Sequence, residues 1–153
     1  MIAMVDYGVG NLFSLKSSLA HLGLEAVVTA DPARLRAADR IILPGVGAFG
    51  DAMEKLTATG LVPVIKEEAR KKPLLGICLG MQLLFEKSYE YGEHQGLGFV
   101  QGEVCPLEPD LKDPALKVPQ IGWNALHILR DDPLFQYILS LIHISEPTRH
   151  AQI

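Results

Sequence analysis

Cysteine is scarce in this sequence: its 153 residues include only Cys78 and Cys105. Two thiols this far apart form neither a disulfide framework nor a metal-binding pair. We therefore expect a cytoplasmic protein with both thiols reduced. Long hydrophobic runs are also lacking, because no apolar stretch approaches the roughly 20 residues of a membrane span. The first residues lack the basic-then-apolar layout of a secretion signal.

An excess of basic charge is lacking as well. Lys and Arg number 14 against 18 Asp and Glu, for a formal net charge of −4. Proteins that bind nucleic acid or anionic membranes usually carry a basic face, so we expect neither partner. There is no internal repeat and no low-complexity linker, and nothing indicates a metal or a cofactor. With 48% hydrophobic residues, the chain can form one globular domain that buries about 70% of its unfolded surface.

Short apolar runs alternate with helical patterns over the first half of the chain. We expect strands over 1–5, 25–29, 40–43 and 73–77, and helices over 12–22, from Pro32, over 50–58, 61–71 and 79–85. This β-α-β-α order predicts an α/β, flavodoxin-like three-layer sandwich with a mostly parallel central sheet. Further along, we expect extended strands over 99–108 and 118–129 and a short helix over 132–139.

Three segments should meet at one edge of this sheet. Right-handed crossovers place the carboxyl ends of parallel strands on the same edge, where such folds bind ligands. DYGVGN (6–11), PGVGAFG (44–50) and Cys78 each follow a predicted strand directly. We therefore expect the functional site there.

Cys78 lies at the joint between a predicted strand and a predicted helix, with Gly76 and Gly80 two residues away on either side. This pattern is typical of a nucleophile elbow, with cysteine in place of serine. The turn strains the central residue, and the glycines leave room for it. The helix N-terminus favours a thiolate, and the N–H of Leu79 would supply half of an oxyanion hole. The alternative is a small buried apolar cysteine with glycines that only help packing.

The segment from Gly45 to Gly50 formally fits GxGxxG, so a dinucleotide site is a rival hypothesis. Three observations argue against a dinucleotide site. The loop follows the third predicted strand rather than the first, and Pro44 precedes the loop. The acidic residues about twenty positions further on lie in a helical run rather than at the end of a strand. We favour a loop that aims the backbone N–H of Val46 or Gly47 as the second oxyanion donor. A plain tight turn is the alternative.

Taken together, these motifs resemble class I (triad-type) glutamine amidotransferases, and more narrowly the glutaminase subunits of imidazole glycerol phosphate synthase. The resemblance covers residue 1 to about residue 139. GxCLGxQ alone indicates the broad class, whereas PGVGAFGDAM and IGWN narrow it. The matching segments are DYGVGNL (6–12), LPGVGAFGDAM (43–53), GICLGMQLLFE (76–86), GLGFVQG (96–102) and VPQIGWN (118–124).

The resemblance implies that Cys78 attacks the side-chain amide of glutamine, forms a thioester and releases ammonia. It assigns the oxyanion hole to Leu79 and the PGVG loop. It also implies that Gly45, Gln82 and Glu90 contact the substrate amino acid. The fold it implies is the class I amidotransferase-like form of the sandwich predicted above.

The resemblance also implies a heterodimer in histidine biosynthesis. Members of the family pass ammonia to a (β/α)8-barrel cyclase subunit. Asn11 in DYGVGN, together with Trp123 and Asn124 in IGWN, would lie at that interface. Without the resemblance, Trp123 would be taken for a half-buried aromatic residue beside a turn.

The chain departs from the family in one respect that matters for chemistry. A cysteine hydrolase needs a histidine and a group that orients it. The family supplies them from a His-Pro-Glu motif, which this sequence does not contain. His143 with Glu146 is a poor substitute, because the spacing is wrong. The other histidines lie on a helix, in a polar loop, on a strand and beside a turn (His21, His94, His127 and His150).

We therefore expect residues 1–139 to be an incomplete amidotransferase domain without its C-terminal strands, and residues 140–153 to be a non-native tail. Such a chain would expose a sheet edge, dissolve poorly and hydrolyse glutamine at background level. Two alternatives remain open. One is a non-catalytic partner of the cyclase, and the other is a triad amidotransferase of another pathway, such as anthranilate synthesis.

Overall fold

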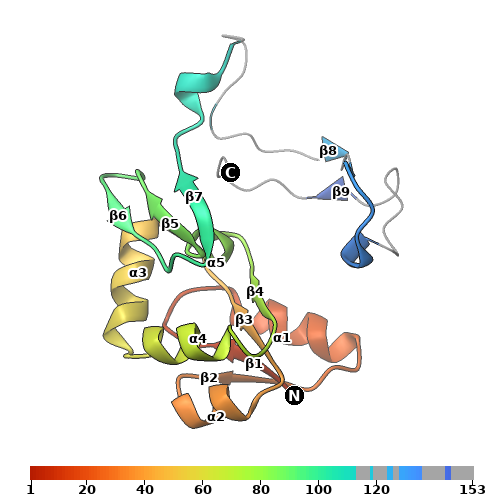
Figure 1. Ribbon diagram of the computed structural model, residues 1–153. Coiled ribbons are helices and arrows are strands. Elements are labelled where there is room, and N and C mark those ends of the chain that lie inside the picture. Colours follow the sequence, from red (N-terminus) through yellow and green to blue (C-terminus); the bar gives the residue numbers. More distant parts are fainter. Residues whose placement is uncertain (113–117, 119–123, 126–127, 136–143, 146–153) are drawn as a thin grey trace. The chain divides into compact units, whose positions relative to one another are not determined.

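A computed structural model describes residues 1–112, 118, 124–125, 128–135 and 144–145 (Figure 1). The chain divides into two compact units, Met1–Pro106 and Leu107–Gln152. The motifs of the expected active site lie in the first unit, which we describe first.

The first unit contains a four-stranded sheet in the order β2-β1-β3-β4. Its strands are β1 (Ile2–Val5), β2 (Ala26–Thr29), β3 (Arg40–Leu43) and β4 (Leu74–Gly76). Every pairing is parallel, so all four carboxyl ends share one edge. The strands predicted over 1–5, 25–29, 40–43 and 73–77 and the predicted parallel sheet are confirmed.

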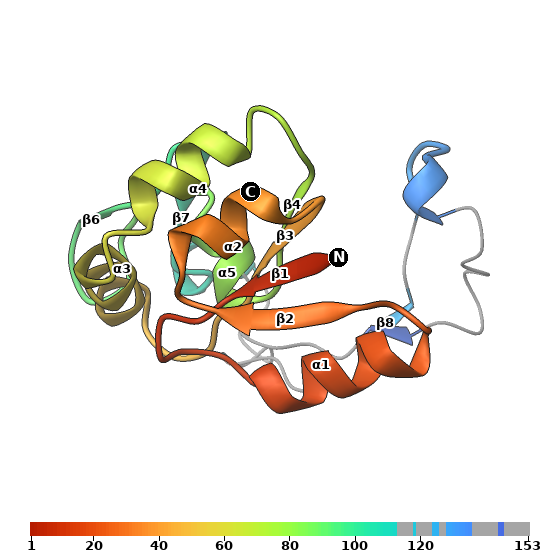
Figure 2. The same cartoon turned by 90° about the horizontal axis from the view of Figure 1, so that it is seen from below.

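Helices cover both faces of this sheet (Figures 1 and 2). On one face, Leu19 of α1 (Leu12–His21) packs against Ile2, Met4 and Ile42. Because side chains alternate along a strand, the buried Ala3 and Val5 point to the opposite face. Right-handed crossovers in this strand order place the helices that follow α1 on that face.

The second helical layer consists of α2 (Pro32–Ala37), α3 (Phe49–Ala58) and α4 (Val62–Glu68). Asp31, a residue type that favours helix N-caps, caps α2: its side chain accepts a hydrogen bond of 2.8 Å from the Ala33 N–H. Gly23 follows α1 with a φ of +71°, the left-handed conformation that often ends a helix.

The helix expected over 79–85 is wrong in length. Helix α5 covers only Leu79–Gln82, and β5 begins at Phe85. The Leu83 carbonyl accepts a hydrogen bond of 2.8 Å from the Leu97 N–H. Pairing with a segment distant in sequence thus overrides the local helical preference of the leucine-rich run.

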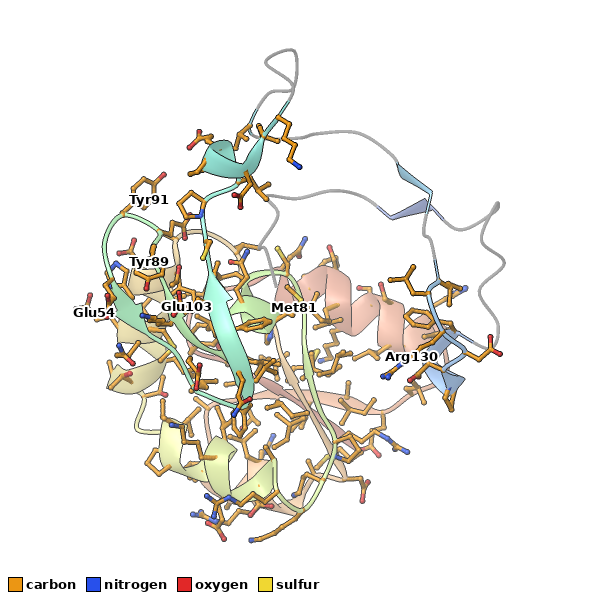
Figure 3. All side chains as sticks on the ribbon, turned by 45° about the horizontal axis from the view of Figure 1, so that its top comes forward. Glu54, Met81, Tyr89, Tyr91, Glu103 and Arg130 are labelled. Atoms are coloured by element: carbon orange, nitrogen blue, oxygen red, sulfur yellow. The ribbon has the colours of Figure 1, made fainter. Side chains whose placement is uncertain are left out.

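A second sheet follows, with the order β6-β5-β7. Its strands are β5 (Phe85–Ser88), β6 (His94–Gln95) and β7 (Val100–Val104), and β5 pairs antiparallel with β6 and parallel with β7. Lys87 forms an ion pair of 3.1 Å with Glu103 across β5 and β7, and its ammonium lies 4.9 Å from the Tyr89 ring centroid. Glu103 and Tyr89 are labelled in Figure 3. The strand expected over 99–108 is shorter than predicted, because β7 ends at Val104.

In the second unit, the described elements are short. They are two 3-10 turns, η1 (Glu108–Asp110) and η2 (Pro133–Phe135), and the antiparallel pair β8 (Asn124–Ala125) and β9 (Ile144–Ser145). Most of the strand expected over 118–129 and of the helix expected over 132–139 lies outside the described residues. Across the part of the chain that the structure describes, none of the helices has the length and apolarity to cross a membrane.

Candidate active site

Cys78 occupies the turn between β4 and α5, and its backbone is strained. Its φ of 56° and ψ of −119° are unusual for a residue with a Cβ atom. The Cys78 carbonyl accepts hydrogen bonds from the Met81 N–H (2.9 Å) and the Gln82 N–H (3.2 Å), which fix the first turn of α5. Cys78 is exposed, which contradicts the alternative of a buried apolar cysteine.

The glycines on either side of Cys78 are required by close backbone contacts. A Cβ atom on Gly76 would lie 2.5 Å from the Cα of Met81. A Cβ atom on Gly80 would overlap the Leu43 carbonyl at the end of β3. The strand therefore turns sharply into α5, as the elbow pattern predicts.

The loop after β3 packs directly on this turn. The Ile77 N–H donates a hydrogen bond of 3.0 Å to the Leu43 carbonyl. A Cβ atom on Gly45 would lie 2.6 Å from the Gly80 nitrogen and 3.0 Å from the Leu79 Cβ. The backbone that leads to Val46 and Gly47 thus approaches the start of α5. Val46 is exposed, and Gly47 has a φ of +100°.

Glu90 contacts the far end of the same loop. Its carboxylate accepts a hydrogen bond of 2.8 Å from the Phe49 N–H, the first residue of α3. Ala48 has no side chain that could cap this helix, so the Glu90 carboxylate takes that role. Gln82 is the last residue of α5 and is half-buried. Of the substrate contacts implied above, Gly45 therefore lies against α5, and Glu90 holds the start of α3.

The expected interface residues are described only in part. Asn11 caps α1, since its side chain accepts a hydrogen bond of 3.2 Å from the Ser14 N–H. Asn124 belongs to β8 in the second unit. Trp123 lies outside the described residues, as do His127, His143 and His150. Their expected positions therefore remain predictions.

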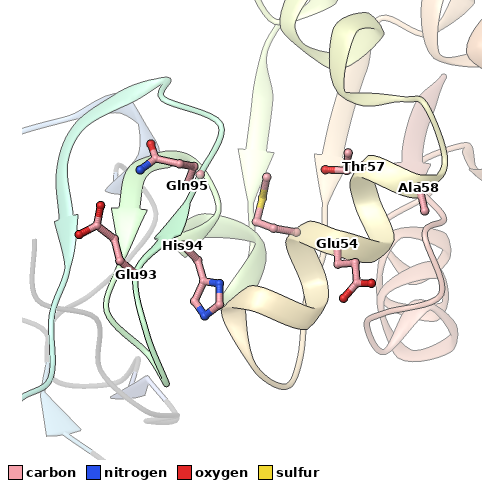
Figure 4. A pocket seen from close by; sticks show the side chains of 8 residues that line it. Glu54, Thr57, Ala58, Glu93, His94 and Gln95 are labelled. Carbon is pink, nitrogen blue, oxygen red and sulfur yellow. The ribbon is translucent and has the colours of Figure 1, made fainter.

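A shallow hollow lies beside α3, apart from the cysteine. It is lined by Met53, Glu54, Thr57, Ala58 and Glu93 to Gly96, and by no residue of the turn at Cys78 (Figure 4). His94, which was expected in a loop, is in β6, and its ring fills the space where a Cβ atom on Gly50 would lie.

The glycine spacing that fits GxGxxG has a packing explanation. Gly45 makes room for the start of α5, and Gly50 for the His94 ring. Neither glycine needs a pyrophosphate to account for it, so the dinucleotide hypothesis loses its main support. Within the described residues, no group of three or more His, Cys, Asp or Glu side chains could hold a metal ion.

An exposed, strained cysteine at the carboxyl edge of a parallel α/β sheet has the backbone geometry of a nucleophile elbow. The family model for class-I glutamine amidotransferases matches residues 3–141. The chain belongs to this family.

Its relatives point to one branch of the family. Imidazole glycerol phosphate synthase subunit HisH of Wolinella succinogenes is 50% identical over 137 residues, covering 89% of this chain and 67% of that protein. The subunit of the same name from Lactiplantibacillus plantarum is 52% identical over 139 residues, covering 90% and 65%. The chain thus spans about two thirds of the length of these curated relatives.

Solved structures support the fold alone. A crystal structure of a glutamine amidotransferase matches with a TM-score of 0.64 at 19% identity, covering 82% of this chain and 64% of that one. A putative peptidase E protein from Listeria monocytogenes matches with a TM-score of 0.53, also at 19% identity, covering 65% and 62%.

Proposed function

We propose that this chain derives from the glutamine-hydrolysing subunit of an imidazole glycerol phosphate synthase, with Cys78 as its nucleophile. The observation that carries the proposal is the exposed thiol at a φ of 56°, with the loop at Gly45 packed on the start of α5. The relatives named above support the choice of pathway, histidine biosynthesis. We expect the cytoplasm as its compartment, because the nucleophile must remain a reduced thiol.

The chemistry would proceed by acyl transfer. The Cys78 thiolate attacks the side-chain carbonyl carbon of glutamine, and the carbonyl π electrons move onto oxygen. The N–H of Leu79 and one from Val46 or Gly47 would stabilise that oxyanion. When the carbonyl reforms, the C–N bond breaks, and a general acid returns the proton lost by the Cys78 thiol to the departing nitrogen, which leaves as ammonia. Water then cleaves the glutamyl thioester to glutamate.

Substrate binding would use the residues around the cysteine. We propose that Gly45 and Gln82 contact the amino-acid end of glutamine, with Glu90 as a further contact. Glu90 holds the start of α3 at the same time, so its substitution would alter both the loop and the substrate contact.

Release of an amine needs a general acid, and this sequence contains no His-Pro-Glu motif. We therefore expect hydrolysis of glutamine at background level. An activated ester avoids this requirement, because p-nitrophenolate leaves with its electron pair and needs no proton. The γ-p-nitrophenyl ester of glutamate should acylate Cys78 once, forming the thioester and releasing one equivalent of p-nitrophenolate.

The experiment measures this burst by absorbance and locates the glutamyl group by mass spectrometry. Cys105 is half-buried after β7 and offers the matched control. Cys78→Ala should abolish the burst, whereas Cys105→Ala should keep it. A folded chain with no Cys78-dependent burst would contradict the assignment of Cys78 as the nucleophile. Ready release of ammonia from glutamine would contradict the expectation of background-level hydrolysis.

Partnership is the second part of the proposal. We propose that Asn11, Trp123 and Asn124 contact a (β/α)8-barrel cyclase subunit in a heterodimer. Titration with that subunit would test the contact, with Asn11→Ala as the weakened variant. Binding without acylation at Cys78 would favour the other candidate, a non-catalytic partner of the cyclase.

We also propose that the amidotransferase segment is residues 1–139 and that residues 140–153 are not native to it. The family match through residue 141 is compatible with this boundary. Sequencing the source gene past codon 139 tests it. A continuous frame into a His-Pro-Glu motif would support the boundary, and a genuine stop codon after Ile153 would overturn it.

A further inference from the structure

Tyr7 is a buried tyrosine that the chemistry proposed above does not use. It follows β1 within DYGVGN, and only 4% of its surface is exposed. Its hydroxyl donates a hydrogen bond of 2.6 Å to the backbone carbonyl of Pro44. Burial raises the pKa of Tyr7, so the hydroxyl remains a donor throughout the neutral range.

The acceptor of this hydrogen bond, the Pro44 carbonyl, belongs to the peptide unit that leads into the loop at Gly45. The Pro44 carbonyl and the Gly45 N–H share one rigid peptide plane, so fixing one fixes the other. The Tyr7 hydroxyl also lies 3.0 Å from where a Cβ atom on Gly45 would be. A Cβ atom on Gly10 would lie 3.0 Å from the Pro44 Cβ. DYGVGN therefore contacts the first residue of the loop at two points.

The loop is thus held at both ends and open in its middle. Tyr7 holds Pro44, and Glu90 holds Phe49 through a hydrogen bond of 2.8 Å. Between them, Val46 is 53% exposed. Gly47, with a φ of +100°, has a conformation open to few other residues. The orientation of the amides at Val46 and Gly47 therefore depends on the two anchored ends.

We propose that Tyr7 is a positioning residue for acyl transfer at Cys78. Its hydroxyl fixes the Pro44–Gly45 peptide and thereby aims the next amides at the oxyanion. This inference rests on the proposed function, because it assumes that an acyl group is transferred at Cys78. A small misplacement of such donors slows acyl transfer strongly, while a reaction that forms no oxyanion is unaffected.

The experiment compares two reactions of the same thiol. The γ-p-nitrophenyl ester of glutamate acylates Cys78 through an oxyanion, whereas iodoacetamide alkylates it by displacement of iodide without one. Tyr7→Phe should slow acylation about 10-fold to 100-fold and leave alkylation within about 2-fold. Tyr91→Phe is the matched control, because Tyr91 is 81% exposed (Figure 3) and should change neither rate.

Equal slowing of both reactions, or no slowing of either, would overturn the proposal. Backbone amide exchange of residues 45–48 gives a second readout, which Tyr7→Phe should accelerate and Tyr91→Phe should not. If the unsubstituted chain is folded but shows no Cys78-dependent acylation, the proposed function fails. In that case amide exchange still tests whether Tyr7 fixes the loop, and exchange of residues 45–48 that Tyr7→Phe leaves unchanged would overturn this part of the proposal.

Loss of a buried hydrogen bond can unfold a protein, so both readouts are taken in sucrose if Tyr7→Phe unfolds in buffer. Excluded osmolytes favour the compact state without forming the missing bond. A Tyr7→Phe chain that cannot fold even there would make Tyr7 a purely structural residue and would overturn the proposal.

Discussion

At the scale of single residues, the backbone of Cys78 stores strain that its own Cβ atom causes. Its φ of 56° and ψ of −119° are far easier for glycine than for other residues. We expect Cys78→Gly to be about 1 kcal/mol more stable to unfolding than Cys78→Ala, after allowing for the greater entropy of unfolded glycine. Urea denaturation of the two variants measures the difference. Equal stabilities would mean that the turn is relaxed in solution.

Gly80 presents the opposite case, in which space rather than conformation forbids a side chain. A Cβ atom there would overlap the carbonyl of Leu43, a backbone atom that cannot move aside without breaking the end of β3. We expect Gly80→Ala to destabilise the chain by about 3 kcal/mol or more.

The control for this prediction is Gly60→Ala. Gly60 has a φ of +71°, and no atom lies within 4 Å of the place where a Cβ atom would be, so only the backbone conformation opposes the substitution. We expect a cost of about 1 kcal/mol there. Urea midpoints that rank the two variants in the reverse order would contradict the packing seen at the turn.

At the scale of elements, one lysine joins two helices. The Lys72 ammonium donates hydrogen bonds to the carbonyls of Leu35 (3.2 Å), Arg36 (2.8 Å) and Ala38 (2.6 Å) at the end of α2. It also forms an ion pair of 2.7 Å with Glu68 at the end of α4. The Glu68 side chain is only 5% exposed. Lys72 therefore caps α2 and neutralises a buried carboxylate at the same time.

This arrangement predicts how stability depends on pH. Hydrogen bonding to Lys72 lowers the pKa of Glu68 below its ordinary value of 4.5. A lowered carboxyl pKa adds stability above the unfolded pKa, and this stability is lost as pH falls through the folded pKa. Glu68→Gln should therefore be less stable than the unsubstituted chain at pH 7, and the difference should shrink as the pH falls from 4.5 through the lowered pKa of Glu68.

Glu67→Gln is the control for that pH series. Glu67 pairs with Lys71 at 2.6 Å, but both side chains are half exposed or more. Exposed pairs contribute little, so Glu67→Gln should shift the urea midpoint at pH 7 far less than Glu68→Gln. Equal shifts would show that burial of Glu68 does not matter to the energetics.

At the scale of the whole molecule, the open edge of the parallel sheet affects solubility. Strand β4 pairs with β3 on one side, and no strand among the described residues pairs with its other side. Leu75 on this strand is 51% exposed. Unpaired apolar edges promote association. We expect Leu75→Lys to lower light scattering of the concentrated chain, with the p-nitrophenolate burst at Cys78 unchanged.

Leu24 provides the comparison for this edge. It is 46% exposed but lies outside any strand, so Leu24→Lys removes similar apolar surface without touching the edge. If the two lysine variants reduce scattering equally, general hydrophobicity rather than strand pairing causes the association.

Local patterns in the sequence were enough to predict the parallel sheet and the elbow. Alternating strands and helices, a capping Asp31 and a terminating Gly23 act within a few residues of chain. Cys78 between two glycines is likewise a local pattern, and the structure gives it an exposed thiol at a strained turn. These features are predictable because the forces that produce them are short-ranged.

Contacts between distant segments decided the rest. The early end of α5 depends on the hydrogen bond from Leu97 to Leu83, and the role of Gly50 depends on the His94 ring. The bond from Tyr7 to Pro44 joins residues 37 positions apart, and no periodicity in the sequence predicts it. The sequence by itself therefore determined the fold class and singled out Cys78 as the candidate nucleophile. Only the tertiary structure decided what holds the loop beside Cys78, because those contacts form when the strands are brought side by side.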